Sequence, residues 1–281
     1  MNEIYLRRKL KEFLREDLEG VEINFDRNPG YTEAKIVAEE SGVFCGGRII
    51  AKALNLLIPR EEGMMTVRMF HLKKDGEGFK AGDTLAHFTA PGEALRNGIR
   101  TVLNLIGHMT KVATNVNKVA EYLGSSPCEL LDTRKTTPGL RIFEKYAVKV
   151  GGGKNHRFGR FAGELVKKED IKILGGIKAA IDDAEYRKPH LTEIEVEVEN
   201  LEQLEEVLRD GRARYIMLDN MSIEMLKAAV WRAGSLSVLE ASGIGDKDLR
   251  EVAGTGVHYI SLSSLILGAS PIKMHMIIVE K

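Results

Sequence analysis

The chain has few cysteines and no net charge, and both features narrow what it can be. Its two cysteines, Cys45 and Cys128, lack CxxC or CxxH spacing, which excludes a disulfide framework and a cysteine-based zinc site and favours a reducing compartment. Forty-one lysines and arginines balance 41 acids. General binding to nucleic acid or to a membrane surface usually needs a basic bias, so we expect neither partner.

Long apolar runs are also missing. No segment approaches the roughly 20 apolar residues of a membrane-spanning helix, and the first 17 residues are amphipathic and charged, unlike the core of a secretory leader. With 281 residues and 43% hydrophobic content, the chain can form one large or two smaller well-buried domains. We therefore expect a soluble, cytoplasmic protein.

Positive charge is concentrated in residues 132–168. This segment has ten lysines or arginines against three acids, a local excess of seven positive charges in a chain whose total is zero. Charge runs often form solvated faces. Here the spacing of DTRKTTPGLR and GGGKNHR, with its glycine run at 151–153, favours a binding site for a small polyanion.

The first part of the chain mixes helix and strand patterns. Apolar spacing predicts a helix over 2–18 and a long one from 92 to about 123. Strands are predicted over 34–41, 64–72 and 84–90, and a turn-rich hairpin region between the last two predicts that they pair. This mixture indicates an α+β domain, which the long helix would connect to a second domain.

The second part has a regular repeat. Strand-like stretches centred near residues 196, 217, 239 and 261 alternate with amphipathic helical stretches, which predicts βα units and a parallel sheet or barrel. Groups at the carboxyl ends of barrel strands line the active face. Glu197 and Asp219 could converge there on a metal ion, whereas Asn220 and Ser242 could simply cap the helices that follow.

Nine motifs, in order along the chain, resemble those of one family. They are REDLEG (15–20), SGVFCGG (41–47), AGD (81–83), RTVLN (100–104), DTRKTTPGLRIFEKYAV (132–148), GGGKNHR (151–157), VEVENLE (196–202), IMLDNM (216–221) and LEASG (239–243). The family is quinolinate phosphoribosyltransferase, also called nicotinate-nucleotide pyrophosphorylase (carboxylating). The resemblance covers most of the chain.

The resemblance implies a two-domain type II phosphoribosyltransferase, of α/β plus α+β class. Residues 1–108, joined by the last strand in 270–281, would form an open-faced α/β sandwich, and 109–269 an incomplete α/β barrel. A homodimer, or a larger assembly of dimers, is also implied. In it the sandwich of one subunit closes over the barrel mouth of the other, and Arg100 enters the partner's site.

The implied reaction is a decarboxylating glycosyl transfer. Quinolinate nitrogen would attack C1 of phosphoribosyl pyrophosphate (PRPP), giving nicotinate mononucleotide, pyrophosphate and CO2 for NAD biosynthesis. Both substrates are polyanions, which fixed cations in a partly dry site can hold. By resemblance, the residues that hold the quinolinate carboxylates are Arg100, Arg134, His156, Arg157 and Lys167.

The PRPP side is assigned by resemblance in the same way. Lys135 would contact PRPP, and Glu197 and Asp219 would lie near the ribose and its Mg²⁺, a hard cation suited to oxygen ligands. The residues expected to act in catalysis are Lys135, Lys167, Glu197 and Asp219. Those expected to hold the 5′-phosphate are Ser242, Gly243 and Ser261.

Some positions depart from the family pattern. Lys167 is followed by Lys168-Glu169-Asp170 where the family usually has Asp-Asn-His, and Glu164 stands where an apolar strand residue is expected. In the phosphate turn Ile244 replaces a glycine, which would hinder a phosphate if that position needs a positive φ. Altered neighbours can change substrate choice while the direct ligands remain.

Two alternatives therefore stay open. One is a divergent paralogue that transfers phosphoribose to, or binds, another aromatic carboxylic acid, with or without decarboxylation. The other is a non-catalytic anion-binding protein, against which Glu197 and Asp219 argue, because passive anion capture gains nothing from nearby carboxylates. Whether Lys167 or Lys168 faces the ligand also stays open.

Overall fold

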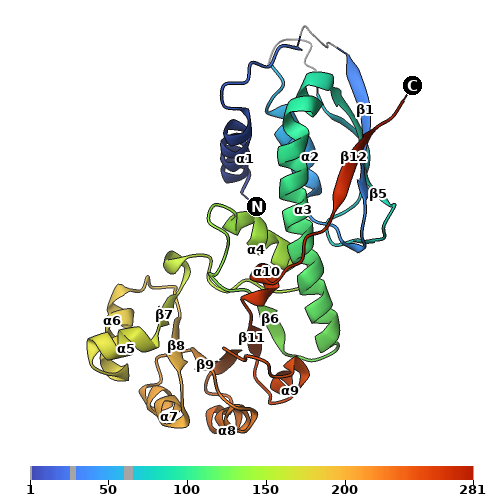
Figure 1. The fold of residues 1–281 in the computed structure, drawn as a ribbon. Coiled ribbons are helices and arrows are strands. Elements are labelled where there is room, and N and C mark those ends of the chain that lie inside the picture. Colours follow the sequence, from blue (N-terminus) through green and yellow to red (C-terminus); the bar gives the residue numbers. More distant parts are fainter. Residues whose placement is uncertain (1, 26–29, 60–65, 281) are drawn as a thin grey trace. The chain divides into compact units, whose positions relative to one another are not determined.

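The computed structural model describes residues 2–25, 30–59 and 66–280 (Figure 1). The chain forms two compact units, each built from separate stretches of sequence. The first comprises Met1–Asn117, Thr137–Gly152 and Gly268–Lys281, and the second comprises Lys118–Thr136 and Gly153–Leu267.

A four-stranded antiparallel sheet forms the centre of the first unit, in the order β12-β1-β5-β3. Its strands are β1 (Tyr31–Ala38), β3 (Arg68–Leu72), β5 (Thr84–Pro91) and β12 (Met274–Ile278). The last strand of the chain thus pairs with the first, with Ile36 opposite Met276. The predicted pairing of β3 with β5 is confirmed. Residues 64 and 65 of the expected strand lie outside the described residues.

Helices cover one side of this sheet (Figure 1). They are α2 (Gly47–Asn55) and the unit's part of α3 (Gly92–Leu123). The same unit contains α1 (Glu3–Leu18), which contacts α2, and α4 (Arg141–Val150). Ala34, Ile36 and Ala38 of β1 are buried while alternate residues are partly exposed, because successive side chains of a strand point to opposite faces. The small strands β2 (Gly42–Val43) and β4 (Gly78–Phe79) form a separate ribbon.

The predicted long helix is confirmed as α3. The domain boundary expected between residues 108 and 109 falls inside this helix and stays a prediction. None of the helices in the described part of the chain is long and apolar enough to cross a membrane. Cys45 and Cys128 are both buried free thiols.

The second unit is a six-stranded parallel sheet in the order β6-β11-β10-β9-β8-β7. The strands are β6 (Glu129–Leu131), β7 (Glu164–Val166), β8 (Ile194–Val198), β9 (Tyr215–Asp219), β10 (Val238–Ser242) and β11 (Tyr259–Ser261). The predicted repeat is confirmed as β8 to β11. Since β6 and β7 lie at opposite edges, the described strands form an open arc, which fits an incomplete α/β barrel.

Helices follow the strands on the outside of this arc (Figure 1). They are α5 (Lys168–Leu174), α6 (Ile177–Arg187), α7 (Leu201–Asp210), α8 (Ile223–Ala233) and α9 (Leu249–Ala253), and the short α10 (Ser264–Leu267) follows β11. Side chains cap three of them at the N-terminus: Asn200 for α7, Ser222 for α8 and Asp248 for α9. Asn220 and Ser242 are therefore not the caps of these helices, and their place at strand ends needs another explanation.

Two members of the glycine run at 151–153 have local structural roles. Gly151 ends α4 where it meets α3, and a Cβ there would lie 2.4 Å from the carbonyl oxygen of Ala113 and 2.7 Å from Cβ of Val116. Gly152 has φ +100°, a conformation that other residues rarely adopt. Helix packing and backbone conformation thus explain part of the run.

We predict that Gly151→Ala lowers the free energy of unfolding by about 1 to 3 kcal/mol, because the new methyl group overpacks the α3–α4 contact. Gly107→Ala is the control on α3. Its Cβ would meet only the carbonyl oxygen of Ile272 at 3.6 Å, and alanine favours a helix by about 1 kcal/mol over glycine. Urea unfolding of both variants measures the difference. Equal effects would contradict this packing role.

Candidate active site

The two halves of the basic segment on either side of α4 lie together at one edge of the second unit's sheet. Asp132, which follows β6, is completely buried. Its carboxylate accepts hydrogen bonds from Asn155 Nδ2 at 2.7 Å and from the backbone N–H of His156 at 2.9 Å. The backbone of Lys154 also pairs with β6, through the carbonyl oxygen of Leu130. Asp132 thus holds the His156 segment beside the loop of Arg134 and Lys135.

His156 contacts two buried acids of the sheet. Its Nε2 lies 2.9 Å from Glu195 Oε2 on β8 and 3.5 Å from Glu240 Oε2 on β10. Its Nδ1 accepts the backbone N–H of Arg157 at 2.7 Å, so the neutral ring carries its proton on Nε2. Burial opposes the charged ring, but Glu195 and Glu240 outweigh burial and raise the pKa of His156.

These three side chains could by spacing also hold a metal ion, since their ligand atoms lie within 4.8 Å of one another. The hydrogen bond from Arg157 argues against it. With Nδ1 occupied as an acceptor, Nε2 of the neutral ring is a proton donor and has no lone pair for a metal. We therefore interpret His156, Glu195 and Glu240 as a hydrogen-bonded network.

Glu240 is the most buried acid of this network, with 2% of its surface exposed. Burial and the neighbouring Glu195 raise its pKa to about 8. Among the described residues, three buried side-chain atoms have no hydrogen-bond partner: Arg157 Nε, Glu240 Oε1 and Ser261 Oγ. The hydroxyl of Ser261 opposes this rise in pKa, but less strongly than burial and Glu195 cause it. Unsatisfied buried polar atoms are uncommon in folded proteins and are expected where a ligand supplies the partner.

Arg157 is fixed beside this network. Its guanidinium donates to the carbonyl oxygen of Gly163 at 2.9 Å. Burial, and then the nearby charge of Arg134, lower the pKa of Arg157, which indicates that the two cations face a common region. Arg134 and Lys135 are exposed on their loop. A fixed arginine, an exposed arginine and the half-buried His156 are groups that can together hold a carboxylate.

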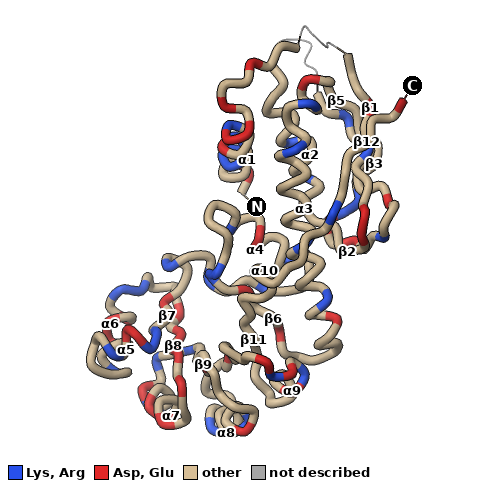
Figure 2. Tube along the Cα trace, in the orientation of Figure 1, with Lys and Arg blue, Asp and Glu red and all other residues tan. Residues whose placement is uncertain are grey.

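A second cluster lies at the carboxyl ends of β8 and β9. Lys168 Nζ is 3.1 Å from Glu199 Oε1 and 3.3 Å from Asp219 Oδ2, and Asn220 Nδ2 donates to the same Asp219 oxygen at 2.7 Å. Burial and the charge of Asp219 raise the pKa of Glu197, so these two acids lie close enough to repel. Figure 2 shows the acidic positions along β8 and the basic positions near α5.

The turn after β10 borders this cluster. Gly243 has φ +61°, and a Cβ there would lie 2.7 Å from Asp219 Oδ1. Gly245 also has a positive φ, whereas Ile244 does not, and its side chain is buried. Ile244 therefore does not occupy a position that requires a positive φ, which was the condition under which it would hinder a phosphate. Asn220, with φ 58°, is the one non-glycine residue with positive φ in the part of the chain that the structure describes.

The structure separates Lys167 from Lys168. Lys167 is the exposed N-cap of α5, and its backbone N–H donates to Asp170. Lys168 reaches Glu199 and Asp219. Glu164, unexplained in the sequence, forms an ion pair with Arg187 of α6 at 3.1 Å. The resemblance predicted roles for Glu197 and Asp219 but none for Glu195. The alternation in IEVEV could have indicated Glu195, because it puts this residue on the same face of the strand as Glu197.

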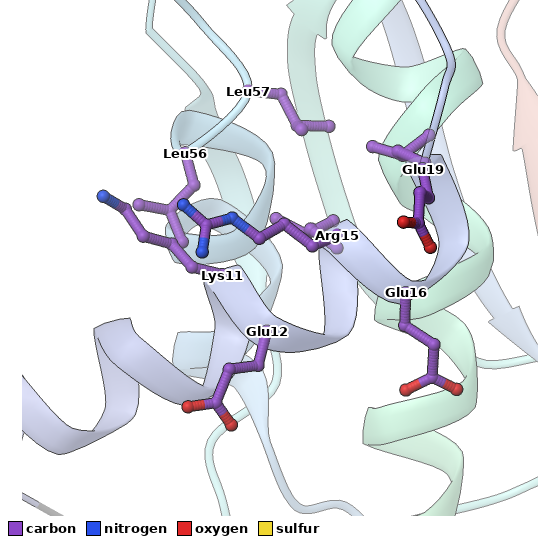
Figure 3. Close-up of a pocket in the computed structure, with 9 residues that line it drawn as sticks. Lys11, Glu12, Arg15, Glu16, Glu19, Leu56 and Leu57 are labelled. Atoms are coloured by element: carbon purple, nitrogen blue, oxygen red, sulfur yellow. The ribbon is translucent and has the colours of Figure 1, made fainter.

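Arg100 belongs to the first unit. It is exposed on α3 and lines a cavity of about 460 Å³ together with His108, Lys111 and Lys273. Its expected role across a dimer interface stays a prediction. A larger cavity of about 550 Å³ lies in the same unit between α1 and residues 56 and 57 (Figure 3). That cavity contains none of the predicted site residues.

One cavity of the second unit reaches the buried network. It has a volume of about 380 Å³ and is lined by His156, Arg157, Glu195 and Glu240. Its other walls include Thr192 and the first residues of β9 and β11. The segment held by Asp132 follows the carboxyl end of β6, which in this parallel sheet is on the same side as the carboxyl end of β9 and its Asp219 cluster.

Comparison with known proteins identifies the family. The model of the quinolinate phosphoribosyl transferase C-terminal domain matches residues 112–277, and that of the N-terminal domain matches residues 24–110. The chain belongs to the quinolinate phosphoribosyltransferase family.

Relatives of this family member are similar over nearly their whole length. A probable nicotinate-nucleotide pyrophosphorylase (carboxylating) of Bacillus subtilis is 37% identical over 268 residues, which are 94% of this chain and 90% of the relative. One of Synechocystis is 34% identical, over 88% of this chain and 83% of the relative. The crystal structure of NadC from Streptococcus pyogenes has a TM-score of 0.87 at 30% identity, covering 100% of this chain and 99% of that one.

We predict that Glu240→Gln changes how stability depends on pH. A carboxyl group with a raised pKa favours folding while protonated, so its contribution is complete below pH 4.5 and is lost as the pH rises toward about 8. Denaturant unfolding between pH 4.5 and 8.5 should therefore show a smaller loss of stability in the variant than in the wild type. The exposed Glu206→Gln is the control. Parallel curves for wild type and Glu240→Gln would contradict the assigned burial of a protonated acid.

We predict that Gly243→Ala costs more stability than Gly245→Ala. Both positions have a positive φ, which costs a side chain about 1 to 2 kcal/mol. Only at 243 would the new Cβ also displace Asp219 and Asn220, since nothing lies within 4 Å of it at 245. Thermal unfolding of the two variants isolates the clash. Equal melting temperatures would show that Gly243 does not need its close contact with Asp219.

Proposed function

We propose that this chain catalyses the transfer of phosphoribose from PRPP to quinolinate, with loss of CO2, to give nicotinate mononucleotide for NAD biosynthesis. The observation that carries the proposal is the network in which Asp132 holds His156 and Arg157 beside Arg134. Family membership supplies the reaction, and this network supplies cations for a dicarboxylic acid.

In this proposal quinolinate binds to the cations of the basic segment. Arg157 and Arg134 face one region, where an anion would relieve their mutual repulsion. A guanidinium can hold a carboxylate through two parallel charge-assisted hydrogen bonds. His156 would donate from Nε2, and Lys167, exposed at the start of α5, would contact the second carboxylate. Arg100 of the partner subunit would complete the site in a homodimer.

PRPP would bind at the carboxyl ends of the strands. Lys135 would contact its pyrophosphate, and Glu197 and Asp219 its ribose hydroxyls. Ser242, Gly243 and Ser261 would hold the 5′-phosphate through hydroxyl and backbone N–H groups. Gly243 and Gly245, both with positive φ, leave the backbone of this turn open to a phosphate.

The donor atoms at this end suit Mg²⁺. Glu197 and Asp219 offer only carboxylate oxygens, and a cation would offset the repulsion that raises the pKa of Glu197. When bound, Mg²⁺ would supply charge neutralisation for the departing pyrophosphate.

The chemistry consists of one substitution and one fragmentation. The N–C1 bond forms while the bond between C1 and the pyrophosphate oxygen breaks. The bond from C2 of the ring to its carboxylate then breaks, and the electron pair left at C2 takes a proton from solvent. The positive ring nitrogen stabilises that electron pair, and Lys167 adds electrostatic support. The side chains contribute chiefly position and charge.

The rewritten segment after Lys167 supports a second candidate. Lys168 replaces a family acid and bonds to Asp219, so the charge beside the ring acid differs from the family pattern. The chain would then be a paralogue that uses another aromatic carboxylic acid. In either case we propose a cytoplasmic enzyme, which the two buried free thiols support.

The deciding experiment mixes the purified protein with quinolinate, PRPP and Mg²⁺ and follows nicotinate mononucleotide and CO2 together. The proposal requires equal amounts of both products. PRPP binding without product would favour the paralogue, and a panel of other ring acids would follow. Ligand binding without turnover on any acid would favour the anion-binding protein.

We predict that Arg157→Lys raises the KM for quinolinate by about tenfold to a hundredfold, the equivalent of one lost charge-assisted hydrogen bond. Lysine retains the charge but cannot hold both Gly163 and a carboxylate in one planar geometry. Lys149→Ala, an exposed cation of the same basic segment on α4, is the control and should leave KM unchanged. Steady-state kinetics compare them. An unchanged KM in Arg157→Lys would remove Arg157 from the quinolinate site.

A further inference from the structure

Lys168 makes the most unusual contact at the carboxyl ends of the strands. It is the first residue of α5, yet its ammonium group reaches acids that follow or end two different strands, Glu199 after β8 and Asp219 at the end of β9. Hydrogen bonds to Glu199 and Asp219 raise its pKa. About a third of the Lys168 side chain is exposed to solvent, so a ligand can reach this contact.

Acidic and basic side chains lie close together at the carboxyl ends of these strands. Glu197, Glu199 and Asp219 are the acids, with Glu169 acting on Glu197 from α5. Lys167 and Lys168 are the cations that offset them. Lys168 contacts two of these acids, Glu199 at 3.1 Å and Asp219 at 3.3 Å.

Asp219 Oδ2 is already bonded from two sides. Lys168 Nζ and Asn220 Nδ2 both donate to it, and an oxygen that accepts two donors has little capacity for a further ligand. A divalent cation that used this oxygen would have to displace the ammonium group and would also be repelled by it. Lys168 thus competes with a metal ion for this oxygen in the free protein.

The family usually has an aspartate at the position of Lys168. An acid in place of Lys168 would change the local charge by two units and would add an oxygen ligand next to Asp219. Such a site would attract a hard cation before any substrate arrived. In this chain the same position contributes the positive charge itself.

We propose that Lys168 is a built-in counter-ion for Asp219, so that the free enzyme binds divalent cations weakly and recognises PRPP with less dependence on Mg²⁺. This inference rests on the proposed function for its substrate, but its first part concerns the free protein alone. In the free state the ammonium group neutralises the strand-end acids. When PRPP binds, the same group is placed to pair with phosphate oxygens.

The test is titration of the free protein with Mn²⁺, a spectroscopic substitute for Mg²⁺, followed by electron paramagnetic resonance. Lys168→Gln should bind Mn²⁺ about twofold to fivefold more tightly than the wild type, which is the range expected for removal of one partly exposed ion pair. Lys168→Asp should bind more tightly still. Lys168→Arg retains the charge and should behave as the wild type. Equal Mn²⁺ affinity in wild type and Lys168→Gln would overturn the proposal.

Two matched variants control for side effects. Lys178→Gln removes a similar ion pair, to Asp182 at 2.9 Å on α6, and should leave Mn²⁺ affinity unchanged. Asp219→Asn removes the acceptor and should abolish the gain when combined with Lys168→Gln. Retention of the gain in the double variant would place the metal elsewhere and overturn the proposal. Circular dichroism confirms that each variant is folded.

The second readout is PRPP binding by calorimetry, with Mg²⁺ and with EDTA. The loss of affinity in EDTA should be smaller in the wild type than in Lys168→Gln, and an equal loss would contradict the role of Lys168 toward PRPP. The Mn²⁺ titration needs no turnover. If no product forms in the reaction assay but Lys168→Gln still binds Mn²⁺ more tightly than the wild type, the counter-ion role of Lys168 is supported and the proposed reaction is contradicted.

Discussion

The buried carboxylate of Asp132 is the interaction on which the basic site depends. It lies at the end of β6, fully removed from solvent, and accepts hydrogen bonds from the side chain of Asn155 and the backbone of His156. A buried charge is costly unless it is fully hydrogen-bonded. Two donors from one loop therefore fix that loop next to the strand, and with it the direction in which His156 and Arg157 point.

The two residues of this fixed loop have different neighbours. His156 meets Glu195 and Glu240, and Arg157 lies near Arg134. At the carboxyl ends of β8 and β9 the signs are arranged differently, with Lys168 between two acids. The proposed active site therefore combines two groups of side chains. One contains cations that could hold an anion, and the other pairs a cation with acids.

Much of the fold follows from pattern alone, because local spacing reports on strands and helices. The repeat of about 22 residues predicted β8 to β11, and apolar spacing predicted α1 and α3. The contacts of the site were less accessible. Nothing local to Lys168 indicates that its ammonium group reaches Asp219, 51 residues further along. Glu195 was passed over because its partner His156 comes from a segment that only the folded sheet brings near. Long-range pairings of this kind depend on register, which composition does not encode.

The position of β12 affects how the protein can be made. This strand forms the edge of the first unit's sheet beside β1, but in the chain it follows the entire second unit. A ribosome completes domains from the N-terminus onward. The parallel sheet can therefore assemble on the nascent chain while β1 still has an open edge, and exposed strand edges invite pairing with other chains. The first part to be synthesised is thus the last to be finished, and its sheet keeps an unpaired edge beside β1 until β12 has been made.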